Sequence, residues 1–370
     1  MNLSYWEYKT WLSNIDFTVV GSGIVGLNCA LSLRERFPKA KILVLEKGIL
    51  PQGASTKNAG FACFGSISEI LADLKNHSEE EVLELVQKRW KGIQLLRKNL
   101  GDANIDFQQH GGHELFLKKQ NDLYQDCIEE MYAINQLLIP VFGEKAFQQQ
   151  ENSFNFKNIQ ENYITNSFEA QLDTGRMMSS LLQLAQKSGI TILNSISVEE
   201  FDQNNDCVVV KTNQFEFQTK NLFIATNGFA SQLLNETVKP ARAQVLITKP
   251  IKDLHIKGTF HLDEGYYYFR NIDKRILFGG GRNLDFKGEE TSTFGETDLI
   301  QNQLETILKE SILPNTIFEV ERRWSGIMGM GAQKKPIVKQ VSENVFCGVR
   351  LGGMGIAIGS LVGKELSDLI

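Results

Sequence analysis

The stretch Asp16 to Gly26, DFTVVGSGIVG, decides the fold of this chain. An apolar, β-branched run leads directly into Gly21, Gly23 and Gly26, which have GxGxxG spacing. This pattern is typical of the first strand, tight turn and helix start of a dinucleotide-binding βαβ unit. Gly21 permits the turn, Gly23 lets backbone approach a pyrophosphate, and Gly26 lets the helix pack closely on the strand. The phosphates of the ligand are then expected at the unpaired N–H groups of the helix start.

The segment after Gly26 completes such a unit. Residues 24–36 carry apolar side chains at helical spacing, and Pro38 prevents the helix from continuing. A second apolar strand, KILVLEK, reaches Glu46 about 20 residues past the last glycine, where a carboxylate meets a ribose hydroxyl in this fold. Because no basic residue replaces Glu46, the sequence favours a cofactor with a free ribose 2′-hydroxyl over one with a 2′-phosphate.

Length and composition are those of an ordinary globular protein. The chain has 370 residues, of which 42% are hydrophobic and 22% charged, enough for a large core divided between two domains. The net charge is −5 and long basic stretches are absent, which argues against nucleic acid or an acidic membrane surface as the main partner. The five cysteines form no CxxC pair, so we expect free thiols in a reducing compartment and no metal site.

The first residues predict a short helix rather than a targeting signal. Residues 1–15 hold Trp6, Glu7, Lys9 and Trp11 in place of a basic start and an apolar centre. No apolar stretch reaches the length of about 18 residues that a membrane-spanning helix needs. We therefore expect a cytoplasmic protein whose first helix folds on the outside of the nucleotide-binding domain, with both tryptophans packing rather than taking part in chemistry.

Further stretches rich in small residues adjoin predicted strands. Residues 49–66 read ILPQGASTKNAGFACFGS, and such a run can press backbone against a flat ligand, although a loop with helix caps has a similar composition. Residues 221–230 end a strand in Thr-Asn-Gly, which offers another backbone edge to the ligand. Residues 344–370 run from a strand through glycines into an apolar helix, with Arg350 at the entrance. Its N-terminus suits a carbonyl or anionic edge of a ring.

The rest of the chain predicts helices and a second sheet. Helices beginning at Ser78 and between 120 and 138 frame residues 105–119, which alternate like strands. His110 and His113 lie in this segment, but nothing supplies a third and fourth metal ligand. After a helix at 171–188, a strand and a hairpin-like pair, the nucleotide-binding domain resumes.

Strand formers then dominate from Arg242 to Arg282, which predicts an antiparallel sheet. By alternation, Tyr266 and Tyr268 share one face and Tyr267 lies on the other. We expect two or three of the polar candidates in this region to face a ligand. These candidates are Arg242, Tyr266, Tyr267, Tyr268, Arg270 and Arg282.

Seven stretches of the sequence resemble the motifs of the FAD-dependent amine and amino acid oxidase family. In chain order they are VVGSGIVGL, VLEKG, GASTKNAGF, LDTGR, IATNG, RAQ and RLGGMGI. This family includes D-amino acid oxidase, glycine oxidase and monomeric sarcosine oxidase, and the resemblance covers nearly the whole chain. It implies an α/β fold with a discontinuous Rossmann-like FAD-binding domain and an α+β substrate domain with a mainly antiparallel sheet. The expected FAD-binding parts are 1–90, 166–238 and 326–370, and the substrate parts are 91–165 and 239–325.

The resemblance also implies which residues bind FAD. The pyrophosphate would lie at the first glycines and the adenosine ribose at Glu46, while Val198 would contact adenine through its backbone. The small-residue stretches would lie along the pyrophosphate and the flavin ring, and the last glycines would place N–H groups near a flavin carbonyl, where they stabilise the anionic reduced ring. The complete set is Gly21, Gly23, Ile24, Val25, Gly26, Glu46, Lys47, Ala54, Ser55, Thr56, Asn58, Ala59, Gly60, Phe61, Val198, Thr226, Asn227, Gly228, Arg350, Gly352, Gly353, Met354, Gly355 and Ile356.

In this family a hydride passes from the carbon beside a substrate amine to the flavin, and water hydrolyses the resulting imine. The protein mainly positions the substrate, which agrees with a sequence that has no evident catalytic triad. An arginine fork would bind a substrate carboxylate. Arg270 and Arg350 are the leading candidates, with Tyr268 as a hydroxyl donor and Arg242 in reserve, and a structural ion pair is the alternative role of each arginine.

The sequence departs from the family pattern where the substrate binds. Amino acid oxidases of this type often carry an arginine just after Trp-Ala-Gly-Leu, whereas WSGIMG places Met328 there. Arg350 and Leu351 replace a small residue and a histidine before the last glycines. Gly326 is the nearest match in sequence to the cysteine that binds the flavin covalently in sarcosine oxidase, so we expect noncovalent FAD.

Substrate identity therefore does not transfer, and alternatives to amine oxidation stay open. A 2-hydroxy acid dehydrogenase would need His110 or His113 to reach the flavin as a base. The second alternative is a flavin-binding protein that has no catalytic activity and acts as an assembly partner. For an oxidase or dehydrogenase of a small amine, amino acid or N-substituted amino acid, oxygen or an electron carrier would accept the electrons.

Overall fold

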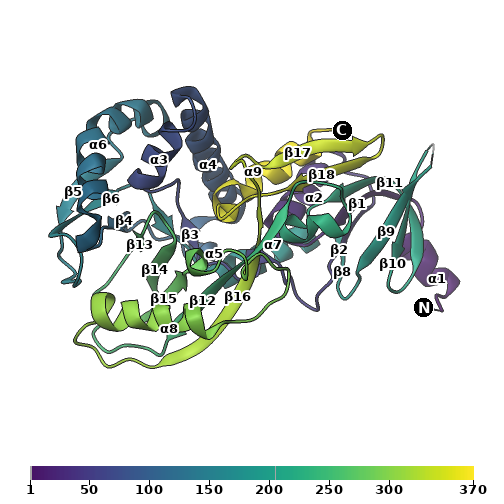
Figure 1. Cartoon of the computed structure of the whole chain (residues 1–370). Helices are drawn as coiled ribbons and strands as arrows, with labels where there is room; N and C mark the ends of the chain where they lie inside the picture. The colour runs from purple at the N-terminus through teal and green to yellow at the C-terminus, as the bar shows by residue number, and fades with distance from the viewer. Residues whose placement is uncertain (1, 205) are drawn as a thin grey trace.

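The computed structural model describes residues 2–204 and 206–370, and its strands form two large sheets (Figure 1). The first sheet has the order β17-β18-β11-β1-β2-β8, and β9 and β10 extend it from β11. The neighbours from β18 to β8 run parallel. The strands are β1 (Ile15–Val20), β2 (Ile42–Leu45), β8 (Thr191–Leu193), β9 (Val198–Gln203), β10 (Val208–Thr212), β11 (Glu216–Ile224), β17 (Ile337–Ser342) and β18 (Val345–Val349).

Apolar runs explain why this sheet is buried. Every residue of β2 and β18 is buried, as is usual for parallel strands covered on both faces. Helix α2 (Ile24–Arg36) packs on α9 (Gly355–Ser367), and α9 packs in turn on α4 (Glu79–Leu100). These contacts place the starts of α2 and α9 beside the same sheet.

The second sheet has the order β16-β12-β15-β14-β13-β4-β6-β5. Its neighbours are antiparallel apart from the parallel pair β13 and β4 among the residues that the structure describes. The strands are β4 (Gly112–Leu115), β5 (Phe147–Glu151), β6 (Asn162–Asn166), β12 (Lys239–Thr248), β13 (Thr259–Leu262), β14 (Tyr267–Ile272), β15 (Arg275–Gly280) and β16 (Val320–Met330).

The two faces of the second sheet differ in chemistry. The outer face carries an aromatic core in which Phe260 stacks on Phe269 and Phe278 packs edge-on, and α8 (Asp298–Ile307) covers it (Figure 1). The opposite face, called the inner face below, carries polar side chains from β4, β13 and β14. Alternation along each strand separates the two sets.

Shorter elements connect the sheets. Strand β3 (Phe61–Ala62) pairs with β7 (Ala170–Gln171) between them. Figure 1 shows α3 and α6 on the side of the second sheet away from α8. The remaining helices are α1 (Tyr5–Glu7), α3 (Ile67–Leu74), α5 (Asp102–Ile105), α6 (Asn121–Phe142) and α7 (Thr174–Lys187).

The predicted fold class is confirmed: a Rossmann-like parallel sheet is combined with a mainly antiparallel one. The long helix expected between 120 and 138 is α6, and the hairpin-like pair is β10 with β11. Both sheets draw strands from separate parts of the sequence, while the five domain limits stay a prediction. No helix within 2–204 or 206–370 is long and apolar enough to cross a membrane.

Two expectations are wrong. Trp6 and Trp11 do not pack into the core, because the helical turns at 5–12 bury only Leu12 and leave the tryptophans 67% and 47% exposed, with Trp6 against the exposed Tyr5 ring. Tyr266 does not share a strand face with Tyr268, because β14 begins one residue later and Tyr266 lies in the preceding turn. Tyr267 and Tyr268 do lie on opposite faces, as predicted.

Candidate functional site

The glycine turn after β1 is closely packed. Gly21 has a φ of +105°, and a Cβ there would lie 2.8 Å from the carbonyl oxygen of Ala225. A Cβ on Gly26 would lie 1.9 Å from the carbonyl oxygen of Gly21. Side chains at these two positions would push α2 away from the ends of β1 and β11. Glycine therefore holds the start of α2 at the edge of the first sheet.

A loop side chain meets the start of α2. The Ile24 N–H donates to Ser55 Oγ over 3.0 Å, and a Cβ on Gly23 would lie 2.8 Å from the same oxygen. Ser55 belongs to a 3₁₀ turn at Ala54–Thr56. The helix end that the sequence assigned to a pyrophosphate is thus bordered by a hydroxyl and by bare backbone.

Glu46 lies just past β2 with its carboxylate turned toward the glycine turn. It accepts hydrogen bonds from Ser22 N at 3.2 Å, Ser22 Oγ at 2.6 Å and Gly48 N at 2.9 Å. The side chain is buried and fixed by these donors. Two carboxylate oxygens have further lone pairs, so Glu46 can still accept from a ribose hydroxyl.

The loop from Ala54 to Phe61 is held at both ends. The Asn58 side chain donates to Ala54 O and Ser55 O, and it accepts from Gly60 N and Thr174 Oγ1. On the other side, Arg270 Nη1 donates to Gly60 O at 3.1 Å. Hydrogen bonds within the protein therefore tie the loop to α7 through Thr174 and to β14 through Arg270.

The last glycines border open space. A Cβ on Gly352 or Gly355 would meet no atom within 4 Å, and one on Gly353 would meet only Met328 Sδ at 3.9 Å. Helix α9 begins at Gly355, so its partly positive end faces this space. Nearby, Asn227 Oδ1 accepts from Leu351 N at 3.1 Å, which joins the ends of β11 and β18.

These segments follow the carboxyl ends of β1, β2, β11 and β18, which lie side by side because the strands are parallel. Thr226 Oγ1 is buried there without a hydrogen-bond partner in the described part of the chain. Of the remaining predicted residues, Val198 begins β9 and Lys47 is exposed. Closely packed glycines, open space beside the last glycines and an unpaired hydroxyl suit a dinucleotide such as FAD.

The inner face of the second sheet lies against the end of the Ala54–Phe61 loop. In register across β14, β13 and β4, Tyr268 lies opposite His261 and His261 opposite Glu114. The Phe61 ring packs edge-on against His261 at 5.4 Å and against Tyr268 at 5.7 Å between ring centroids. A polar wall therefore adjoins the loop that the sequence assigned to the flavin ring.

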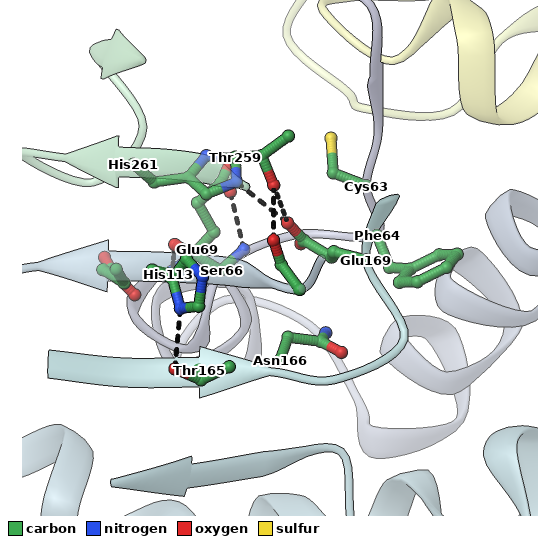
Figure 2. Close-up of polar contacts among 12 residues, drawn as sticks. Cys63, Phe64, Ser66, Glu69, His113, Thr165, Asn166, Glu169, Thr259 and His261 are labelled. Carbon is green, nitrogen blue, oxygen red and sulfur yellow. Dashed lines mark hydrogen bonds and ion pairs between the residues drawn. The ribbon is translucent and has the colours of Figure 1, made fainter. Parts of the chain in front are cut away.

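Glu169 completes this wall from the segment between β6 and β7 (Figure 2). Gly112 makes room for it, since a Cβ there would lie 1.8 Å from Glu169 Oε2. Oε2 accepts from His261 Nε2 at 3.0 Å and from Thr259 Oγ1 at 3.4 Å. Oε1 has no hydrogen-bond partner among residues 2–204 and 206–370, and the side chain is 1% exposed.

Burial and charge shift the pKa values of this wall. Burial lowers the pKa of His261, but the neighbouring carboxylate of Glu169 outweighs it and raises that pKa to about 9. Burial raises the pKa of Glu114 to about 7, although Ser68 donates to it from N and Oγ. Burial also raises the pKa of Tyr268 to about 12. At neutral pH His261 is therefore a cation and Tyr268 a neutral donor.

Each predicted arginine has a partner within the protein. Arg242 makes a two-pronged ion pair with Glu289, at 2.9 Å from Nε and 2.7 Å from Nη2. Arg350, with a φ of +64°, donates from Nε and Nη2 to Lys335 O. The buried Arg270 donates from Nη1 to the carbonyls of Gly60 and Leu172, and burial lowers its pKa to about 10.

The two histidines considered as bases lie away from the inner face. His113 is on the outer face, with Nδ1 2.8 Å from Thr165 Oγ1 and its ring against Phe260, and burial lowers its pKa to about 4. His110 is exposed. The described residues contain no group of three or more potential metal ligands.

Sequence reasoning missed the polar residues of the inner face, His261, Glu114, Glu169 and Thr259. The first two lie in the strand-like runs TFHL and GHEL, where a polar residue at an alternating position was a usable signal. Glu169 lies outside any strand, and its place depends on Gly112, which is distant in sequence.

Comparisons with known proteins agree with a flavin-dependent redox protein. The family model described as FAD dependent oxidoreductase, DAO, matches residues 16–369. Probable oxidoreductase OrdL of Haemophilus influenzae is 21% identical over 383 residues, which cover 98% of this chain and 84% of that protein. Glycine oxidase from Geobacillus kaustophilus is similar in structure with a TM-score of 0.77 at 17% identity, over 96% of this chain and 94% of that one. L-proline dehydrogenase from P. horikoshii is similar with a TM-score of 0.74 at 18% identity, over 96% of this chain and 93% of that one.

The fold and the glycine-rich ends of its parallel strands are those of a dinucleotide-binding protein, with a polar wall on the second sheet. The match over nearly the whole chain makes the assignment specific: the chain belongs to the DAO family of FAD-dependent oxidoreductases. The family resemblance and the cofactor predicted from the sequence motifs are thereby confirmed.

Proposed function

We propose that this protein oxidises the carbon–nitrogen bond of a small amine, amino acid or N-substituted amino acid. The observation that carries the proposal is the inner face, where Tyr268 and the Glu169–His261 pair meet the Phe61 loop. Such a wall can hold a nitrogen-bearing substrate through neutral donors and carboxylate acceptors. The names of similar proteins, glycine oxidase and L-proline dehydrogenase, support the same bond type.

The FAD-binding residues are proposed as the sequence implied them. The glycine turn and Ser55 would hold the pyrophosphate, Glu46 the ribose, and the backbone of 352–355 the edge of the ring. Gly326, whose added Cβ would lie 3.1 Å from the Lys57 side chain, offers no thiol for a covalent link, in keeping with noncovalent FAD. When bound, FAD supplies an acceptor for two electrons.

Oxidation of a carbon–nitrogen bond requires little acid–base catalysis from the protein. The substrate carbon loses a hydride while the nitrogen lone pair forms a C=N bond and an N–H proton passes to water. Water then adds to the imine and releases a carbonyl compound and an amine or ammonia. The tasks of the chain are to orient the substrate and to exclude bulk water from the reacting carbon. Oxygen or an electron carrier would then remove the electrons.

Of the four predicted substrate residues, we infer direct contact for Tyr268, whose hydroxyl stays protonated. Arg270 is proposed to act by fixing the flavin loop, because its Nη1 already donates to two carbonyls. Arg242 and Arg350 are proposed as structural, since Glu289 and Lys335 occupy them. A cytoplasmic location is proposed on the five free cysteines.

An anaerobic screen tests the function. The flavin of the purified protein is followed while small amines, amino acids, N-substituted amino acids and 2-hydroxy acids are added in turn. Bleaching by a nitrogen compound with release of a carbonyl product supports the proposal. Bleaching by 2-hydroxy acids alone would instead establish a hydroxy acid dehydrogenase, and a loaded flavin that no compound bleaches would favour a non-catalytic role.

A further inference from the structure

Glu169 is an incompletely satisfied buried carboxylate. His261 and Thr259 donate to Oε2, whereas Oε1 has no donor within the described ranges. The side chain is 1% exposed, and a buried carboxylate oxygen without a hydrogen bond is costly. A donor from outside the chain is therefore expected at Oε1.

The charges around Oε1 favour a cationic donor. Glu69, Glu114 and Glu169 all lie close enough to His261 to raise its pKa. Two cations oppose these three carboxylates. One is His261, and the other is Arg89, which donates to Phe64 O and lies near Gly65. The cluster carries an excess negative charge whenever Glu114 is ionised. A substrate carboxylate would be repelled here, and an ammonium group would be attracted.

Cys63 lies between Glu169 and the last glycines in the network of contacts. Cys63 Sγ is 3.8 Å from Met354 Sδ in the loop of the last glycines. In Figure 2 the Cys63 thiol points away from Glu169, and the charge of Glu169 helps burial to raise the pKa of that thiol. The Cys63 thiol therefore contacts the loop of the last glycines, whereas the Glu169 carboxylate is turned toward His261 and Thr259 of β13.

We propose that Glu169 Oε1 binds the second, non-reacting ammonium group of a diamine substrate. This inference rests on the proposed amine oxidation and narrows its substrate class. The reacting nitrogen lies toward the last glycines, and a carbon chain spans the distance to Glu169. The route passes Phe61, whose partly exposed ring lies against His261 and Tyr268.

The test compares α,ω-diamines of three to six carbons with monoamines of the same length. Anaerobic flavin reduction is measured for the wild-type holoprotein, for Glu169→Gln and for the control Glu130→Gln, which changes an exposed carboxylate on α6. We expect the wild type and the control to prefer the best diamine. In Glu169→Gln the ratio of kcat/KM for diamine over monoamine should fall about 10- to 100-fold, the loss of one charge-assisted hydrogen bond.

Thermal shift provides a readout that does not depend on turnover. The best diamine should raise the melting temperature of the wild type more than the matched monoamine does, and Glu169→Gln should remove the difference. If Glu169→Gln does not fold, Glu169→Asp should keep a diamine preference in weakened form. An unchanged ratio in a folded Glu169 variant, or no diamine preference in the wild type, overturns the inference and leaves water as the occupant of Oε1. If no amine bleaches the flavin, the proposed function itself fails.

Discussion

Single glycines set how closely the backbone segments of the turn after β1 pack together. Gly21 and Gly26 are required by packing, since added side chains would collide with backbone. Gly23 is different, because its added Cβ would meet only the Ser55 side chain, with Oγ at 2.8 Å. A substitution there disturbs the space for a ligand more than the fold itself.

We expect Gly23→Val to abolish FAD binding while the protein still folds, because the branched side chain would occupy the position that we propose for the pyrophosphate. Flavin absorbance of the purified variant and its circular dichroism measure the two effects. Gln148→Val is the control, since it places the same side chain at an exposed position of β5 in the second sheet. A fully loaded Gly23→Val would place the pyrophosphate elsewhere.

The His261–Glu169 pair makes stability depend on pH. The pKa of His261 is raised from 6.5 to about 9 in the folded protein. Its stabilising contribution is therefore complete below about pH 6.5 and is lost as the pH rises through about 9. The melting-temperature gap between the wild type and His261→Gln should shrink over this interval. A gap that is constant or widens from pH 6.5 to 9 is incompatible with the ion pair.

At the scale of elements, Arg270 on β14 fixes the Phe61 loop and the segment after β7. It bridges Gly60 O and Leu172 O, which belong to different parts of the chain. Removing the guanidinium leaves two buried carbonyls without this donor. The loop would then lose the anchor that keeps Phe61 against the inner face.

We expect Arg270→Met to lower the free energy of unfolding by about 2 kcal/mol, within the range for an unsatisfied buried acceptor, and to weaken FAD binding. Arg270→Lys should recover part of both losses. Chemical denaturation and flavin titration provide the measurements, with Arg322→Met on the exposed side of β16 as control. Normal stability with a raised substrate KM would instead support the carboxylate anchor that the sequence suggested.

The features that could be predicted from the sequence are those that depend on a single strand, turn or helix. The Gly21 turn, Glu46 and the opposite faces of Tyr267 and Tyr268 follow from local spacing, so they were predictable. The Glu169–His261 pair was not, because it depends on the parallel pairing of β4 with β13 and on the space left by Gly112. Arg270 was recognised as a candidate, but its carbonyl partners come from distant segments.

At the scale of the whole molecule, FAD is expected to join the two sheets. The edge of the first sheet that we propose for FAD and the inner face of the second meet through β3, β7 and the Ala54–Phe61 loop. A ligand that binds only the folded protein stabilises it by RT ln(1 + L/Kd), where L is the free ligand concentration, so the stabilisation keeps growing with the logarithm of the ligand concentration above Kd.

Removing FAD should therefore lower the melting temperature and speed proteolysis within 54–61 and 350–355, and adding FAD should restore both. At FAD concentrations of about 100 times Kd, the stabilisation is about 2.7 kcal/mol. Differential scanning fluorimetry and limited proteolysis of the apoprotein and holoprotein measure the change. Identical melting and cleavage in both forms would show that the sheets do not depend on the cofactor.

The order of strands in the first sheet has a consequence for synthesis. The turn that begins at Gly21 is made early, but β11 and β18, which lie on one side of β1, come from residues 216–224 and 345–349. The loop 352–355 leaves the ribosome later still. A nascent chain therefore contains the glycine turn at Gly21 long before all the segments proposed to bind FAD have been made. FAD is expected to bind only after the loop 352–355 has been synthesised.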